Sequence, residues 1–216
     1  LVGRAALFRF DPGMNRIFFK TFLTIALLGL LVCVGDESQG ADANWQKLHQ
    51  QAVNRQRRLI FNNDGNEPVY SCTNATADEL LRSRTAPLAG SQVDSIFYCT
   101  WSSGFGMFTH NTKVGQVFNT REGMFKDNRA QEFLDKGIDP LKVMVEFAHQ
   151  HGIELFWSFR VNDTHDHSRT DYGPVMFRAN KLKEAHPEWL IGSADKPPKY
   201  GAWSAVDFGV TEIREL

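Results

Sequence analysis

The chain has 216 residues, 42% of them hydrophobic and 23% charged, a composition within the range of soluble globular proteins. Its 24 Lys and Arg residues against 25 Asp and Glu residues give a formal net charge of −1 at pH 7. Nucleic-acid binding normally requires a strongly basic patch, and nothing in this balance suggests one. We therefore expect no nucleic acid among its partners.

Residues 14–40 have the pattern of a secretory signal peptide. Two basic residues precede an apolar run over residues 22–34, which is too short to predict a membrane span, and small residues follow it. Residues 1–13 precede Met14 and are interpreted as a non-native upstream extension. The pattern predicts a secreted or periplasmic protein with no stable membrane anchor after cleavage; the alternative is an uncleaved N-terminal anchor.

The first half of the remaining chain predicts a lead-in, two strands and a helix. Residues 41–57 are polar and are interpreted as a lead-in helix or linker. In "RRLIFNNDGNE" a short apolar run ends in turn residues, as a buried strand does. "TADELLRSR" carries Thr76 and Glu79 at capping-box spacing, so a helix should begin there. "DSIFYCTW" is rich in β-branched and aromatic residues and predicts a second strand.

The clearest helix of the sequence is "DPLKVMVEFAHQHG", after a short helix expected near 129–135. Asp139 suits its N-cap, Pro140 its first position and Gly152 its C-terminal cap. "IELFWSFR", over 153–160, follows directly and is apolar on both faces, which is typical of a parallel sheet covered by helices on both sides. We expect the three strands to be parallel and adjacent in chain order.

Each predicted strand ends in a polar cluster: "NNDGNE", "TWSSGFGMFTH" and "RVNDTHDH". In a β/α barrel the loops after the strands converge on one face, so these clusters predict one shared site. Turn formation by Asn, Asp and Gly is the alternative for some of them. It does not explain Arg160, because a guanidinium at a strand end is costly to bury without a partner. The candidate substrate-binding residues are Asn62, Asn63, Asp64, Trp101, Arg160, Asn162, Asp163, His165 and Asp166.

Two further features leave alternatives open. His165 and His167 form a histidine-x-histidine pair that could hold zinc with a third ligand, although one such pair is a weak signal and no metal is assigned. Cys72 and Cys99 could form a disulfide in an oxidising compartment, or serve as small buried hydrophobic residues.

Three stretches, "DPLKVMVEFAHQHGIELFWSFRVN", "HPEWLIG" and "WSAVDFGVTEIREL", carry a family resemblance. In this order they resemble the secreted family-10-like glycoside hydrolase domain of bacteria, in a planctomycete-type branch. The match covers residues 139–216 and, more loosely, 58–101. The resemblance implies an α/β fold in which residues 58–216 form the N-terminal portion of a (β/α)₈ TIM barrel, apparently truncated. It also implies a carbohydrate substrate and no cofactor.

The resemblance places the catalytic carboxylates of the family on strands beyond residue 216. Asp64, Asp163 and Asp166 are the acids near the predicted strand ends, and none matches the family's catalytic acids, so the catalytic residues stay unknown. The expected function is a glycoside-hydrolase-like protein that binds or hydrolyses glycosidic bonds in polysaccharide when full length. The alternatives are a non-catalytic carbohydrate-binding remnant or inactive fragment, and a metal-dependent hydrolase that uses the two histidines.

Overall fold

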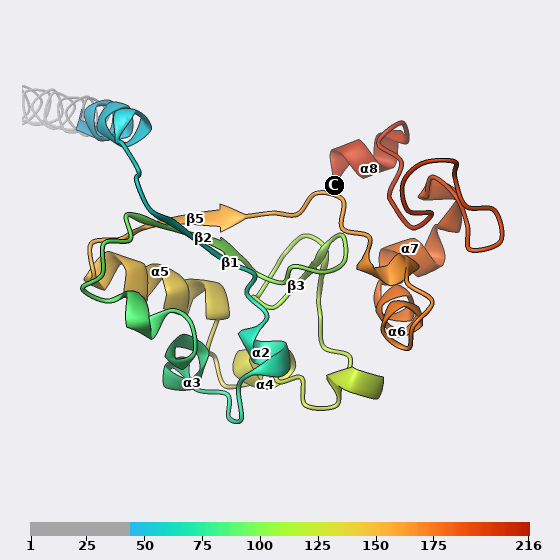
Figure 1. The fold of residues 1–216 in the computed structure, drawn as a ribbon, viewed down its shortest axis with the longest axis horizontal. Helices are drawn as coiled ribbons and strands as arrows, with labels where there is room; N and C mark the ends of the chain where they lie inside the picture. The colour runs from blue at the N-terminus through green and yellow to red at the C-terminus, as the bar shows by residue number, and fades with distance from the viewer. Residues whose placement is uncertain (1–43) are drawn as a thin grey trace, which may run out of the picture. The chain divides into compact units, whose positions relative to one another are not determined.

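The computed structural model describes residues 44–216, and the signal peptide and upstream extension expected over residues 1–40 lie outside the described residues (Figure 1). The chain divides into two compact units, the first ending at Gln56 and the second covering residues 57–216. The described part of the first unit is a helix over residues 44–54, within the predicted lead-in. No helix in the described part of the chain is long and apolar enough to cross a membrane.

A three-stranded parallel sheet with the order β1-β2-β5 lies at the centre of the second unit. Its strands are β1 (Ile60–Asn63), β2 (Ser95–Cys99) and β5 (Glu154–Ser158). The register aligns Phe61 with Ile96 and Ile96 with Leu155. The prediction of three parallel strands, adjacent in chain order, is confirmed. The described residues form no closed barrel, so the TIM-barrel identity stays a prediction.

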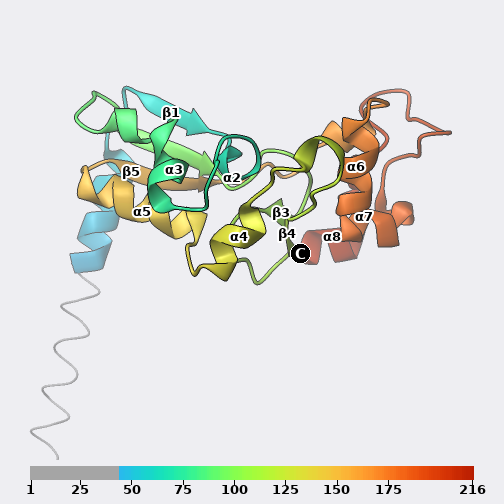
Figure 2. The same cartoon turned by 90° about the horizontal axis from the view of Figure 1, so that it is seen from below.

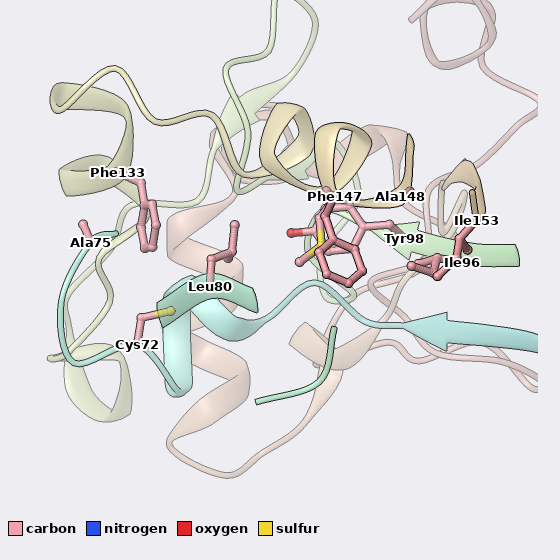
Figure 3. Packing of buried hydrophobic residues seen from close by; sticks show 10 residues of the cluster. Cys72, Ala75, Leu80, Ile96, Tyr98, Phe133, Phe147, Ala148 and Ile153 are labelled. Carbon is pink, nitrogen blue, oxygen red and sulfur yellow. The ribbon is translucent and has the colours of Figure 1, made fainter. Parts of the chain in front are cut away.

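Helices α3 (Ala77–Arg82) and α5 (Pro140–Gln150) cover one face of this sheet (Figure 1). Ile96 and Tyr98 of β2 are fully buried against Phe147 and Ala148 of α5, as Figure 3 shows. Removing such side chains from water contributes about 25 cal/mol per Å² of apolar surface, so this layer stabilises the unit by hydrophobic burial.

Both predicted helix starts are confirmed by side-chain caps. The Thr76 hydroxyl accepts a hydrogen bond from the Glu79 backbone N–H at 3.3 Å, and Asp139 accepts two from the first turn of α5. In a complete capping box the Glu79 carboxylate would accept from the backbone N–H of Thr76. Here it accepts from the backbone N–H of Thr73 instead. At the end of α5, Gly152 has φ +66°, a left-handed conformation that favours glycine.

Strand β5 is an edge strand, and its surroundings differ from the prediction. Ile60 and Phe156 point to the face opposite α5 and are 51% and 38% exposed. Trp157 is also 48% exposed. The expectation that elements cover β5 on both faces is therefore wrong within the described residues, because α5 covers one face and only β2 pairs with this strand.

The other elements of the second unit connect and extend this sheet. They are α2 (Glu67–Tyr70), β3 (Met107–Phe108), β4 (Gln116–Val117), α4 (Ala130–Asp135), α6 (Tyr172–Ala179), α7 (Lys181–Ala185) and α8 (Thr211–Glu215). The short 3-10 helices are η1 (Ala86–Leu88), η2 (Gly123–Phe125), η3 (His165–His167) and η4 (Pro187–Trp189). Strands β3 and β4 form a separate two-residue parallel ladder. The α6 and α7 pair lies at the end of the unit toward which β5 points (Figures 1 and 2).

Cys72 and Cys99 are both buried and both free. Burial raises the pKa of the Cys72 thiol to about 12 and that of the Cys99 thiol to about 11. Both side chains are therefore neutral thiols at physiological pH, and they act as small buried hydrophobic residues rather than as a disulfide or as nucleophiles.

Candidate functional site

The polar segments after the three parallel strands meet at one cleft of about 460 Å³. Asp64 follows β1, Ser102 and Ser103 follow β2, and Arg160 follows β5. Their convergence has a geometric cause, because parallel strands present all their carboxyl ends at the same edge of the sheet. His165, from the loop after β5, also lines the cleft.

An ion pair between Arg160 and Asp64 crosses the sheet edge in this cleft. Nη2 of Arg160 lies 2.7 Å from Oδ1 of Asp64, and Nη1 donates to the carbonyl of Ser102 at 3.3 Å. These two contacts connect the ends of all three strands. The side chains remain 42% and 38% exposed, so a ligand can reach both. A guanidinium has five N–H donors, and these contacts use two of them.

Asp163 and His165 form a hydrogen-bonded pair beside the ion pair. Asp163 is 7% exposed, and its Oδ1 accepts from the backbone N–H groups of Gly104 at 2.7 Å and His165 at 3.0 Å. Its Oδ2 lies 2.7 Å from Nδ1 of His165. The His165 side chain is 52% exposed and lines the cleft, so Asp163 supports the site from below while His165 faces the ligand space.

Two tyrosines supply the aromatic part of the cleft wall. Tyr70 comes from α2 and Tyr172 from the start of α6, and the Tyr172 ring centroid lies 6.1 Å from that of His165. Burial raises the pKa of both phenols, so each stays a neutral hydroxyl at physiological pH. Ser168 and Thr170 complete this wall with further hydroxyl groups.

Asp166 and Asn162 hold the loop after β5 in place and do not line the cleft. Asp166 is 1% exposed and pairs with the buried ammonium of Lys183 at 2.8 Å. The Lys183 ammonium also donates to the backbone carbonyl of Asp163 at 3.1 Å. The amide of Asn162 accepts from the Val206 backbone N–H at 3.0 Å and donates to its carbonyl at 3.2 Å.

The two asparagines at the end of β1 lie in different environments. Asn63 is fully buried, where its Oδ1 accepts from the Gly65 N–H at 3.0 Å and its amide donates to the Thr85 hydroxyl at 3.4 Å. This is the turn chemistry that the sequence left open as an alternative. Asn62 is exposed, and its amide lies 3.4 Å from Oδ1 of Asp64 at the edge of the cleft.

Trp101 lies in the core rather than on a ligand surface. Its side chain is 3% exposed and stacks on Phe118, with ring centroids 4.3 Å apart. Its backbone has φ +107°, a conformation that residues other than glycine rarely adopt, at the point where the chain turns sharply after β2. A ring buried in this way offers no open face to a ligand, so the substrate-binding role expected of Trp101 has no geometric support.

The sequence did not indicate several of the side chains that line the cleft. Tyr70 and Tyr172 belong to short helices without strong periodic patterns, and Ser168 and Thr170 lie in an irregular loop. His167 lines the cleft, but its Nδ1 is hydrogen-bonded to the Thr164 carbonyl. Within residues 44–216 no three His, Cys, Asp or Glu side chains come together as a metal site.

A second and larger cavity of about 690 Å³ is apolar. It lies beside β5, with Trp157 and Phe159 on one wall and Phe108 on another, and Leu182 and Phe208 contribute from α7 and the loop before α8. We call it the apolar groove. The rings of Trp157 and Phe159 stack within it at 5.6 Å and 8°.

No protein-family model matches the chain, and a search among curated proteins finds no match either. The glycoside-hydrolase resemblance therefore rests on sequence motifs, and the chemistry of the cleft is the independent guide to function.

Proposed function

We propose that this chain belongs to a secreted, glycoside-hydrolase-like protein and binds carbohydrate in the polar cleft. The observation that carries the proposal is the exposed Arg160–Asp64 pair at the joined strand ends, surrounded by hydroxyl groups. Sugars present many hydroxyls, and each can donate to a carboxylate and accept from a guanidinium. Alternating donors and acceptors suit such a ligand better than an apolar one.

The charge of the cleft favours a neutral glycan. Apart from its two histidines, the lining carries one negative group, Asp64, and one positive group, Arg160, which are paired. A strongly anionic or cationic ligand would meet no surplus of opposite charge there. The phenols of Tyr70 and Tyr172 are neutral and add partly apolar surface, which suits the faces of a sugar ring.

For residues 44–216 we propose binding rather than complete hydrolysis. Glycoside hydrolysis usually needs two carboxyl groups, about 5–5.5 Å apart for retention and about 6.5–9.5 Å apart for inversion. Asp64 is the carboxylate that these residues place in the cleft, since the Asp163 carboxylate is buried under three hydrogen bonds. Hydrolytic activity would require a second carboxyl group from elsewhere in a longer protein.

The experiment is calorimetric titration of the folded chain with soluble neutral glycans: β-glucan, xylan and chitin oligosaccharides. We expect at least one to bind, and Arg160→Ala to weaken that binding about tenfold or more, as loss of charged hydrogen bonds does. Arg82→Ala is the matched control, because Arg82 also forms an exposed pair, with Glu79 at 3.2 Å, but on α3. Absence of binding to every glycan, or equal binding by the Arg160 variant, would contradict the proposal.

A further inference from the structure

The carboxylate of Asp163 is held so firmly that it imposes one orientation on its neighbour. Its Oδ1 accepts from two backbone N–H groups, those of Gly104 and His165, at 2.7 Å and 3.0 Å. Its Oδ2 is left to face Nδ1 of His165 at 2.7 Å. The Asp163 side chain is 5% exposed, and another rotamer would leave the buried N–H of Gly104 and the partly buried N–H of His165 without this acceptor.

This arrangement determines which nitrogen of His165 carries the proton. An ionised carboxylate only accepts hydrogen bonds, so the short contact requires a proton on Nδ1. In a neutral imidazole the other nitrogen, Nε2, is then unprotonated and acts as an acceptor. The half-exposed His165 ring lines the polar cleft, so in this tautomer it adds an acceptor to the same lining as the Arg160 donors.

We propose that Asp163 is a positioning residue that fixes the tautomer of His165, and that Nε2 of His165 accepts a hydrogen bond from a hydroxyl of the bound ligand. The second half of this inference rests on the carbohydrate-binding function proposed above. It assigns a specificity to the cleft: at this position the ligand must donate, so a free hydroxyl binds and the corresponding methyl ether does not.

Replacement of Asp163 by asparagine reverses the polarity of the pair. The carbonyl oxygen of the new side-chain amide can keep both backbone hydrogen bonds made by Oδ1, so the NH₂ group of that amide takes the place of Oδ2 and donates to Nδ1. The proton of a neutral His165 must then move to Nε2, which becomes a donor toward the cleft. D163N therefore changes one proton position while the fold is retained.

Long-range ¹H–¹⁵N NMR of ¹⁵N-histidine-labelled protein measures the tautomer directly. Spectra are recorded at about pH 8, above the usual imidazole pKa of about 6.5, and the His165 signals are identified by their loss in His165→Asn. We expect the Nδ1–H form in the wild type and the Nε2–H form in D163N. Asp78→Asn, the same change at an exposed position on α3, is the control and should leave the Nδ1–H form. An Nε2–H form in the wild type, or no change in D163N, overturns the positioning role.

The ligand half is tested with a neutral glycan that binds the wild type and with its partially O-methylated derivatives. We expect one methyl ether to bind the wild type at least about tenfold more weakly than the free glycan, and this preference to be at least about threefold smaller in D163N. Steric effects of the methyl group are present in both proteins and cancel in the comparison. Equal preference in both proteins overturns the acceptor role. Absence of binding by any glycan overturns the proposed function and this half together, while the tautomer is still decided by NMR.

Discussion

The polar cleft and the apolar groove share one wall, the extended segment that ends β5, yet they have opposite chemistry. Trp157 and Phe159 line the groove, whereas Arg160 lines the cleft. Successive side chains of an extended strand point to opposite sides, so one short segment separates the two cavities. Strand β5 is apolar on both faces, but the extended segment that follows it past the sheet edge is apolar on one side and polar on the other.

Helix α7 repeats this division on the other side of the same loop. Leu182 faces the apolar groove, and the next residue, Lys183, is buried beneath the cleft loop with its ammonium on Asp166. Exposed apolar side chains such as Trp157 and Phe208 thus form part of the groove, while a buried ion pair lies beneath the cleft. Substitutions on each side test whether the two regions differ in the way that this geometry implies.

The largest expected effect comes from the ion pair beneath the cleft. Asp166→Ala leaves the Lys183 ammonium, at 0% side-chain exposure, without its carboxylate partner. Breaking a buried pair in this way costs about 3–5 kcal/mol of the free energy of unfolding. Urea denaturation followed by circular dichroism measures the loss, and the Asp166→Ala, Lys183→Met double variant should recover much of it.

Glu146→Ala is the matched control for this measurement. Glu146 pairs with Lys142 at 3.8 Å on α5, with both side chains more than half exposed, so its loss should cost less than about 1 kcal/mol. If Asp166→Ala were as mild as this control, the buried pair would not be what holds the cleft loop.

A hydrophobic fluorescent dye such as anilinonaphthalene sulfonate tests whether alternate residues of this segment face different cavities. We expect the dye to bind the apolar groove, and the Trp157→Ser, Phe159→Ser variant to weaken this binding about tenfold, because it removes the stacked aromatic wall. Arg160→Ser lies next to the changed positions but faces the cleft and should leave dye binding unchanged. Equal losses in the two variants would show that the cavities are not separated by side-chain alternation.

The sheet was predictable from the sequence because its signals are local. The apolar runs around Ile60, Ile96 and Leu155 end in turn residues, and Thr76 and Asp139 cap the helices that cover them. Exposure of β5 was not predictable, since hydrophobicity on both faces indicates that a strand favours burial but does not specify which segment covers it. The two-residue strands β3 and β4 are too short to give a periodic signal.

The position of the cleft was predictable from the sequence, but only some of the residues that line it were. Asp64, Arg160 and His165 line it because they follow strands whose ends must converge. Asp166 has the same polar character in the sequence, but its pairing with Lys183 depends on a tertiary contact that residue type does not reveal. Trp101 could equally have been core or surface, and only the aromatic cluster around it decides.

The pH dependence of the free energy of unfolding tests the role of a carboxyl group that is buried next to the cleft. Glu67 follows Asn66 of the cleft wall but is itself fully buried, and burial raises the pKa of its carboxyl above the ordinary value of 4.5. Its contribution to stability is therefore fully present below about pH 4.5 and is lost as the pH rises through the folded-state pKa. Glu67→Gln should remove this loss and gain stability relative to the wild type as the pH increases.

Glu79→Gln provides the opposite sign in the same urea measurements. The backbone N–H of Thr73 and the Arg82 guanidinium lower the pKa of the partly exposed Glu79 carboxyl, so its contribution is present above the ordinary value of 4.5 and is lost as the pH falls through its folded-state pKa. If the Glu67 and Glu79 variants differed from the wild type with the same pH trend, the Arg84 guanidinium, whose Nε lies 3.9 Å from Oε1 of Glu67, would outweigh burial and keep this carboxyl ionised.

The smallest expected effect on stability comes from the group that matters most for the proposed ligand. Arg160 and Asp64 are 42% and 38% exposed, and exposed ion pairs contribute about 0–1 kcal/mol because water screens them. Arg160→Ala should therefore lower the free energy of unfolding by less than about 1 kcal/mol in urea denaturation while it weakens glycan binding. A loss above about 2 kcal/mol would mean that the pair mainly fastens the three strand ends together. Its place in the cleft would then be structural, and the contrast with the buried Asp166–Lys183 pair would disappear.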